Sequence, residues 1–306
     1  MIEVDHLTKY FGDRLALDDV SFRVESGKVT GFLGPNGAGK TTTMRLILGL
    51  DRPTSGMALI DGRALQDYTD PLCQVGALLD AKFAHPRRTA FNHLVTVATT
   101  HGIPTSRVRE VLSQAGLEAV AAERVGKFSL GMTQRLGIAT ALLGSPRALI
   151  LDEPINGLDV DGVRWFRGLC RDLADSGVAV FLSSHLMSEV ELVADRVIVL
   201  GRGRVLQDAP LGHFRRGTST FEVITEQAVE FVGALSERGA AVTIIDERTC
   251  TVTGLSAKEI GVLALKTGTV LEGLEETSRS LEDSYRELTD DHVEYRAGES
   301  SAASGS

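Results

Sequence analysis

The segment GPNGAGKT, from Gly34 to Thr41, has the residue types and spacing of a phosphate-binding loop. Glycines let the backbone turn its N–H groups toward phosphate oxygens, and the N-terminus of a following helix adds positive potential. We expect Lys40 to reach the β- and γ-phosphates of a nucleotide, Thr41 to bind Mg²⁺ and Thr42 to touch the α-phosphate. The residues around the phosphates would be Gly34, Pro35, Asn36, Gly37, Ala38 and Gly39. A glycine turn without a ligand is the alternative, but the apolar strand VTGFLG before it and the helix TTTMRLILGL after it favour nucleotide binding.

Two carboxylates come directly after a second buried strand, in ALILDEP. Asp152 is suited to hold Mg²⁺, usually through water, and Glu153 to orient or deprotonate a water that attacks the γ-phosphate. Taken alone, Asp-Glu-Pro is equally compatible with a turn that ends a strand. The phosphate loop elsewhere in the chain favours the catalytic interpretation.

A single histidine, His185, ends another buried strand, VAVFLSSH. Such a histidine is more often a surface or hydrogen-bonded residue than a catalytic one. Its place at the carboxyl end of a strand in an α/β sheet, where ligands gather, favours a contact with the γ-phosphate and the attacking water.

The elements that must position these side chains alternate between strands and helices. Residues 2–10 and 16–24 have the alternating pattern of strands, and the runs ALIL, VAVFL and RVIVL, separated by helical segments, indicate parallel strands. Residues 81–145 have mainly helical patterns. We therefore expect an α/β fold of the P-loop NTPase class in residues 1–215, with a mostly parallel sheet, an N-terminal antiparallel β subdomain and a helical insertion.

The pattern changes beyond residue 215 and predicts a small α+β domain over residues 216–290. The expected elements are a strand at 220–225, a helix at 227–238, strands at 241–246 and 249–253, a helix at 256–267 and a strand at 269–274. This βαββαβ order is that of a ferredoxin-like module. The small, polar residues 291–306 predict a disordered tail.

The amino-acid composition of the chain argues against several classes of function. The formal net charge of −9 argues against general affinity for nucleic acid or an anionic membrane surface. Cys73, Cys170 and Cys250 lack the spacing of a disulfide framework or a zinc site, which predicts a reducing cytoplasm. The N-terminus MIEVDHLTKY lacks a signal-peptide pattern, and no apolar run approaches the roughly 18 residues of a membrane span. If the protein works at a membrane, another component must anchor it there.

The order of the segments GPNGAGKT, SLGMTQR, LDEP, NGLD and SSH resembles that of the nucleotide-binding subunit of ABC transporters, over about residues 1–215. In that family a signature of the form L-S-G-G-Q, followed by Q-Q-R, binds the γ-phosphate of ATP held by the opposite subunit. Ser129, Gly131, Gln134 and Arg135 match it, whereas Leu130 and Met132 do not. Ser129 can cap the helix and also aim its hydroxyl at the nucleotide. Met132 lacks the polar amide that the family has at this position. Met132, Leu136, Ala139 and Leu143 form an apolar stripe that we expect in the core.

The resemblance implies further site residues. Phe11 matches the aromatic residue that stacks on adenine, with Tyr10 as the neighbouring alternative. Asp159 matches the aspartate loop that links the two nucleotide sites of a dimer. Asp80 stands where the family has a glutamine, and our hypothesis is that it keeps a metal-sensing role with altered reach. An ordinary carboxylate at a strand end is the alternative.

VGALLD, FSLGM and the closing SLEDSYRELTD resemble the exporter branch of bacitracin- and daunorubicin-type resistance ATPases. That branch implies Mg²⁺ and ATP as ligands, a second copy of the chain and an integral permease as partners, no nucleic acid, and a peripheral place on the cytoplasmic face of the membrane. A soluble ABC ATPase acting on DNA or ribosomes fits less well, because the chain has one cassette and no long coiled coil between Lys40 and Ser129. A regulatory protein that binds ATP with little turnover stays an alternative.

Overall fold

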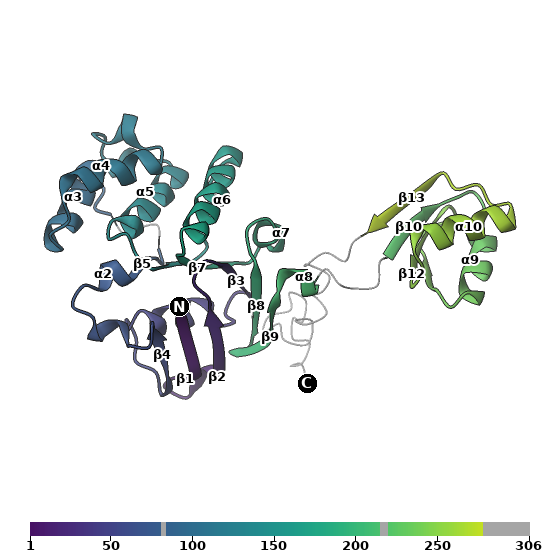
Figure 1. The fold of residues 1–306 in the computed structure, drawn as a ribbon, viewed down its shortest axis with the longest axis horizontal. Helices are drawn as coiled ribbons and strands as arrows, with labels where there is room; N and C mark the ends of the chain where they lie inside the picture. Colours follow the sequence, from purple (N-terminus) through teal and green to yellow (C-terminus); the bar gives the residue numbers. More distant parts are fainter. Residues whose placement is uncertain (81–83, 215–219, 278–306) are drawn as a thin grey trace, which may run out of the picture. The chain divides into compact units, whose positions relative to one another are not determined.

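The computed structural model describes residues 1–80, 84–214 and 220–277, and the chain divides into two compact units between Ala209 and Pro210 (Figure 1). Among these residues, no helix is both long and apolar enough to cross a membrane. The predicted tail at 291–306 and the closing segment SLEDSYRELTD lie outside the described ranges.

The first unit begins with a three-stranded antiparallel sheet in the order β2-β1-β4. Its strands are β1 (Ile2–Phe11), β2 (Arg14–Val24) and β4 (Ser55–Ile60). Buried side chains recur at every second residue near the start of β1 and the end of β2, as expected for strands with one face in a core. The predicted N-terminal antiparallel subdomain is confirmed.

The second sheet has six strands in the order β5-β6-β7-β3-β8-β9. They are β5 (Val75–Leu78), β6 (Ala148–Leu151), β7 (Ala179–Ser184), β3 (Val29–Leu33), β8 (Arg196–Gly201) and β9 (Arg204–Pro210). The first five pair in parallel, as predicted, and β3, β6 and β7 are buried along their whole lengths. The carboxyl ends of these strands therefore meet along one edge. β9, which the sequence analysis did not predict, follows β8 after the turn Arg202-Gly203.

Helices surround this sheet and form the predicted insertion. Those of the insertion are α3 (Ala90–Thr100), α4 (Thr105–Gln114) and α5 (Leu130–Leu142); the others in the first unit are α1 (Lys40–Ile47), α2 (Pro71–Gln74), α6 (Val160–Asp175) and α7 (Met187–Glu191). Figure 1 shows the insertion as one group beside α6. Trp165 on α6 joins the two, because its Nε1 donates to the Gln114 carbonyl over 2.8 Å and the Arg135 guanidinium lies 4.6 Å from its ring centroid. Short 3₁₀ turns lie at Leu65–Asp67, Glu118–Val120 and Val125–Lys127.

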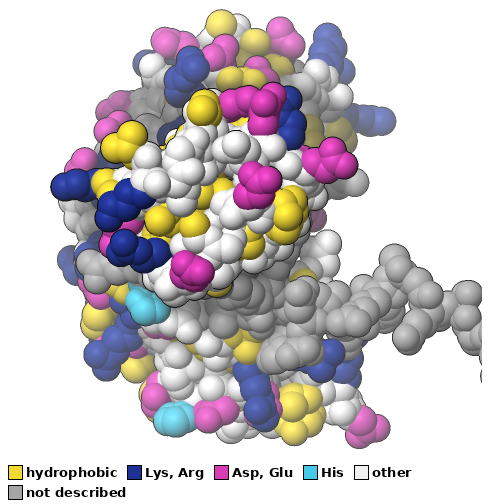
Figure 2. Space-filling view, turned by 90° about the vertical axis from the view of Figure 1, so that its right-hand side faces the viewer, with side chains coloured by type: hydrophobic (Ala, Val, Ile, Leu, Met, Phe, Trp, Pro, Cys, Tyr) yellow, Lys and Arg dark blue, Asp and Glu magenta, His cyan; other side chains and the backbone are white. Residues whose placement is uncertain are grey.

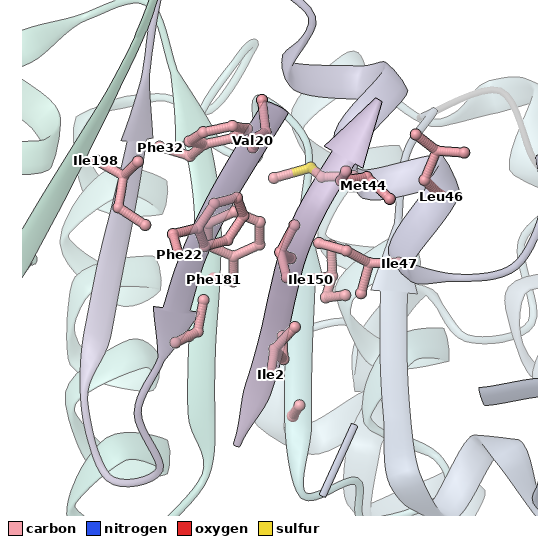
Figure 3. Close-up of a cluster of buried hydrophobic side chains, with 14 of the residues drawn as sticks. Ile2, Val20, Phe22, Phe32, Met44, Leu46, Ile47, Ile150, Phe181 and Ile198 are labelled. Carbon is pink, nitrogen blue, oxygen red and sulfur yellow. The ribbon is translucent and has the colours of Figure 1, made fainter. Parts of the chain in front are cut away.

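Three phenylalanine rings join the two sheets of the first unit. Phe22 comes from β2, Phe32 from β3 and Phe181 from β7, and their ring centroids lie 5.1 to 5.6 Å apart in tilted arrangements. Figure 3 shows these rings beside Met44 of α1 and Ile150 of β6. This packing fixes β3, β6 and β7 relative to one another, and with them the segments that follow their carboxyl ends.

The second unit has its own antiparallel sheet in the order β11-β12-β10-β13. Its elements after α8 (Leu211–Phe214) are β10 (Thr220–Ile224), α9 (Ala228–Glu237), β11 (Ala241–Ile244), β12 (Thr249–Thr253), α10 (Ala257–Thr267) and β13 (Gly273–Thr277). A separate core includes Phe221, Phe231 and Leu235. The chain therefore forms the predicted βαββαβ module with ferredoxin-like connectivity. Figure 2 shows apolar side chains on the visible surface interspersed with polar and charged ones.

The predicted position of the last strand, 269–274, is wrong. Gly268 ends α10 in a left-handed conformation, with φ +72°. The Thr269 N–H still donates to the Ala264 carbonyl over 2.9 Å, so this residue belongs to the helix cap. Pairing with β10 consequently begins at Gly273.

Candidate active site

The phosphate loop lies between β3 and α1, where the sequence predicted it. Its backbone takes conformations that require glycine, with φ angles of +84° at Gly37 and +108° at Gly39. A Cβ on Gly39 would lie 2.6 Å from the Leu17 side chain, and one on Gly34 would lie 2.6 Å from the Leu200 carbonyl oxygen. The tight loop therefore presents backbone N–H groups beside the N-terminus of α1.

Lys40 begins α1 and is buried, with 7% of its side chain exposed. Its Nζ donates to the Gly34 carbonyl over 2.6 Å and lies 3.8 Å from Glu153 Oε1. Burial lowers the pKa of Lys40, while the neighbouring Glu153 and Asp152 carboxylates oppose that shift. The loop thus holds an ammonium group whose interactions with anions are strong because water is largely excluded.

Asp152 follows β6 and connects three parallel strands at their carboxyl ends. Its carboxylate accepts hydrogen bonds from the Thr41 and Ser183 hydroxyls, and its N–H donates to the Leu78 carbonyl over 2.8 Å. A threonine hydroxyl beside one carboxylate is a donor set that suits Mg²⁺, which is usually held by one or two protein oxygens with water and phosphate oxygens completing the shell. Within the described ranges, no three His, Cys, Asp or Glu side chains gather as a metal site. Thr41 and Asp152 therefore fit an ion that arrives with a nucleotide.

Glu153 lies between two other candidate residues. One carboxylate oxygen is 3.8 Å from Lys40 Nζ, and the other is 2.8 Å from His185 Nδ1. Its backbone has φ +48°, a left-handed conformation that is unfavourable for a residue with a side chain. The Ser183 hydroxyl accepts a hydrogen bond from the Glu153 N–H over 2.9 Å. The fold thus brings together the lysine at the start of α1, the carboxylate that follows β6 and the histidine that follows β7.

Lys40 and Glu153 border a cavity of about 700 Å³, a volume that suits a nucleotide, whereas His185 is not among the residues that line it. Predicted residues along its wall are Phe11, Pro35, Asn36, Gly37, Gly39, Lys40, Thr41, Thr42, Asp152 and Glu153. Phe11 and Tyr10 are similarly exposed, at 49% and 45%, but Phe11 is the one that lines this cavity. Lys9 Nζ lies 4.8 Å from the centroid of the Phe11 ring.

Part of the cavity wall was not predicted from the sequence. Arg14, Leu15 and Ala16 contribute from the start of β2, and Arg202 and Gly203 from the turn after β8. This turn lies against both β2 and the phosphate loop, because the Gly203 carbonyl accepts from the Asp18 N–H over 2.8 Å and its N–H donates to the Ala38 carbonyl over 3.0 Å. The glycine in the strand-to-strand sequence GRGR is the signal that could have indicated a close backbone approach there.

The signature residues lie at the start of α5, away from this cavity wall. Ser129 is the N-cap, and its hydroxyl oxygen accepts from the Met132 N–H over 3.1 Å. Gly131 lies against the loop that follows Glu153, since a Cβ there would be 2.8 Å from the Gly157 carbonyl oxygen. Leu130 packs over Gly157. Leu130, which stands where the family usually has glycine, therefore makes a contact within this chain. Leu136, Ala139 and Leu143 are buried, as predicted for the core stripe, whereas Met132 is only partly buried.

Asp159 and Asp80 also lie outside the cavity wall. Asp159 is the N-cap of α6, with its carboxylate accepting from the Gly162 N–H over 2.8 Å. Asp80 comes two residues after β5, whose last residue, Leu78, bonds to Asp152 through the backbone. The structure thus brings Asp80 near the carboxyl edge of the sheet through its chain position, and its proposed metal sensing stays a prediction.

A glycine loop joining a parallel strand to a helix, a buried lysine and two carboxylates after a neighbouring strand define a P-loop nucleotide hydrolase. Residues 17–156 match the ABC transporter family. The bacitracin transport ATP-binding protein BcrA of Bacillus licheniformis is 38% identical over 250 residues, which cover 81% of this chain and 79% of that protein. The chain therefore belongs to the family of ABC transporter ATP-binding proteins and is an ABC ATPase.

Other comparisons agree with this assignment. The lantibiotic transport ATP-binding protein SrtF of Streptococcus pyogenes is 36% identical over 67% of this chain and 89% of its own length. A dimeric ATP-binding cassette in a post-hydrolysis state bound to ADP and Pi is similar, with 26% identity, a TM-score of 0.63 and coverage of 69% of this chain and 99% of that one. Residues 219–282 match a family described as a domain of unknown function. The predicted family and fold class are confirmed.

Proposed function

We propose that this chain drives the export of antibiotics, other drugs or lipophilic compounds through a separate membrane permease, by binding and hydrolysing ATP as a dimer. The observation that carries the proposal is the position of Glu153, held between Lys40 and His185 at the wall of the phosphate-loop cavity. The names of the bacitracin and lantibiotic transport relatives support the class of cargo. The permease would hold the chain at the cytoplasmic face of the membrane.

ATP would occupy the cavity with its adenine on Phe11 and its phosphates in the loop from Gly34 to Thr42. Lys40 Nζ, now on the Gly34 carbonyl, would turn to the β- and γ-phosphate oxygens, to which its buried charge is strongly attracted. Thr41 and Asp152 would hold Mg²⁺, which when bound supplies charge neutralisation at the phosphates.

Hydrolysis would use Glu153 to orient or deprotonate the attacking water. The hydrogen bond between His185 Nδ1 and Glu153 Oε2 restrains this carboxylate, and the Lys40 ammonium lies 3.8 Å from its other oxygen. His185 would also contact the γ-phosphate. The residues provide positioning and charge, which are the main requirements of phosphoryl transfer.

Two copies would close head to tail around two ATP molecules, so that Ser129 and Gly131 of one copy meet the γ-phosphate held by the other. A hydroxyl whose oxygen accepts the helix-capping bond still has a hydrogen to donate to a phosphate. Asp159, fixed at the N-terminus of α6, would lie near the dimer interface and link the two sites, and Asp80 would sense the metal. The dimeric cassette among the similar structures supports this arrangement. The second unit would assist dimerisation.

Replacement of Glu153 by Gln tests this function, because the amide keeps the side-chain shape and loses the base. We expect ATP turnover to fall by about 10²- to 10⁴-fold, with ATP binding retained and ATP-dependent dimers accumulating in size-exclusion chromatography. Glu123→Gln, an exposed position in the insertion, is the matched control and should hydrolyse ATP as the wild type does. Unchanged turnover in Glu153→Gln, or a wild-type chain without turnover, contradicts the proposal.

The permease partner requires a separate test. A tagged copy produced in its native cells is expected to co-purify from detergent-solubilised membranes with an integral membrane protein whose removal abolishes resistance to the exported compound. Recovery with nucleic acid or ribosomes instead would favour the soluble ATPase.

A further inference from the structure

Gln134, in the second turn of α5, reaches the catalytic segment through its side chain. Its Nε2 donates to the Glu153 backbone carbonyl over 3.1 Å, and only 4% of the residue is exposed. Gln134 matches a residue that follows the family signature, and the resemblance assigned it no role. A hydrogen bond between two elements at a buried site is a specific contact, because an amide without a partner there is costly.

The carbonyl that Gln134 holds belongs to a residue in an unfavourable backbone conformation. Left-handed φ angles at residues other than glycine are unfavourable and persist where surrounding contacts impose them. At Glu153 the N–H donates to the Ser183 hydroxyl of β7, and the carbonyl accepts from Gln134 of α5 over 3.1 Å and from the Asn156 N–H of the following turn over 3.3 Å. These bonds restrain the peptide groups on both sides of the Glu153 Cα, and so set the direction of its carboxylate toward Lys40 and His185.

The first turn of α5 packs on the same segment a few residues further along the chain. A Cβ on Gly131 would lie 2.8 Å from the Gly157 carbonyl oxygen, and one on Gly157 would lie 2.3 Å from the Leu130 side chain. The helix start and this loop are so close that neither glycine could carry a Cβ without a shift of its neighbours. A displacement of α5 must therefore move the loop and pull on the Glu153 carbonyl at the same time.

We propose that Gln134 is a positioning residue that couples the two ATP sites of the dimer. The coupling rests on the function proposed above, in which Ser129 at the start of α5 contacts the ATP of the opposite copy. Contact at Ser129 sets the position of α5, and Gln134 passes that position to the Glu153 carbonyl of its own site. The symmetric dimer has two such links, so ATP bound at either site favours the hydrolytic geometry of the other.

The test compares Gln134→Met, which keeps the length of the side chain and removes the donor, with Thr140→Val on the same helix, where the lost hydroxyl bonds only to the Leu136 carbonyl. In Gln134→Met we expect kcat to fall about tenfold, KM for ATP to change less than twofold and the Hill coefficient for ATP to fall toward 1. Thr140→Val should keep all three values. Wild-type kcat and Hill coefficient in Gln134→Met would overturn the proposal.

Gln134→Glu separates positioning from a merely structural role. A protonated carboxyl group can donate to the Glu153 carbonyl, whereas an ionised one repels it. The kcat of this variant relative to wild type should therefore decline as pH rises, while the corresponding ratio for Gln134→Met stays flat. Parallel pH profiles in the two variants would overturn the proposal. A wild-type chain without ATPase activity would instead refute the proposed function, and with it the coupling.

Discussion

The contact between Gly131 and Gly157 allows a sharp test of the dimer interface. Gly131→Ala adds one methyl group at the point where α5 meets the loop after Glu153. That methyl would lie 2.8 Å from the Gly157 carbonyl oxygen and 3.6 Å from the Leu158 Cα. A carbon and a carbonyl oxygen normally approach to about 3.3 Å, so the start of α5 must move by about half an ångström.

We expect Gly131→Ala to lower the free energy of unfolding of the first unit and to weaken the association of the dimer. Overpacking of this size costs about 1–3 kcal/mol, and alanine in a helix recovers about 1 kcal/mol relative to glycine. The first unit should thus lose at most about 2 kcal/mol of unfolding free energy, which lowers Tm by less than about 8 °C. The displaced turn carries Ser129, and a dimer contains two such turns, one at each ATP site. A loss of about 1 kcal/mol at each site raises the dissociation constant of the ATP-dependent dimer by about 30-fold.

Size-exclusion chromatography over a range of protein concentrations in ATP measures this constant, best in the Glu153→Gln background, where ATP persists. Gly168→Ala on α6 is the matched control, because a Cβ there meets nothing within 4 Å. It should gain about 0.5–1 kcal/mol of stability and dimerise normally. Dimerisation and turnover of Gly131→Ala equal to those of Gly168→Ala would refute the role of this contact, as would a collapse of ATP binding by the monomer.

Three further expectations concern single side chains. Phe11→Ala should weaken ATP binding by about ten- to a hundredfold in isothermal titration through lost stacking, whereas Tyr10→Ala should not. Phe181→Ala, which removes a ring from the aromatic cluster, should cost about 3–5 kcal/mol in chemical denaturation. Burial raises the pKa of Glu189 from its ordinary 4.5, so Glu189→Gln should stabilise the chain in denaturation, with a gain that is small below pH 4.5 and grows as pH rises. A constant gain across that range, or a cost for Phe181→Ala below about 1 kcal/mol, would contradict these expectations.

The parallel strands could be predicted because both of their faces are buried. β6 and β7 are continuous apolar runs, and a run of that length between turns indicates a strand covered by other layers. β9 escaped prediction because it lies at the edge of the sheet, where most of its residues are only partly buried and the sequence RVLQDAP lacks a clear period. The position of the last strand was wrong because a helix cap, set by one glycine conformation, continues to Thr269.

The site, too, has parts that could be predicted from the sequence and parts that could not. GPNGAGKT and LDEP could be placed because each is a local strand-and-turn pattern whose neighbours determine where it points. The resemblance selected Phe11, with Tyr10 as the alternative, but the strand pattern alone could not exclude Tyr10, because a shift in the pairing of β1 with β2 at Lys9 and Tyr10 changes which side chain faces the cavity. Arg202 lies far from the loop in sequence and reaches it from the turn between β8 and β9, of which only β8 was predicted.

The contact between Gln134 and Glu153 is the part of the site that was hardest to predict from the sequence. Its partner is a backbone carbonyl, and no residue pattern marks such a group. Three elements converge on Glu153: α1 through Lys40, β7 through Ser183 and α5 through Gln134. Each contact restrains a different atom of the same residue, so the loss of any one leaves the others in place and changes the direction of the carboxylate rather than its presence. Substitution at Gln134 should consequently lower kcat while sparing ATP affinity, whereas substitution at Lys40 should affect both, because Lys40 also lines the cavity proposed to hold the phosphates.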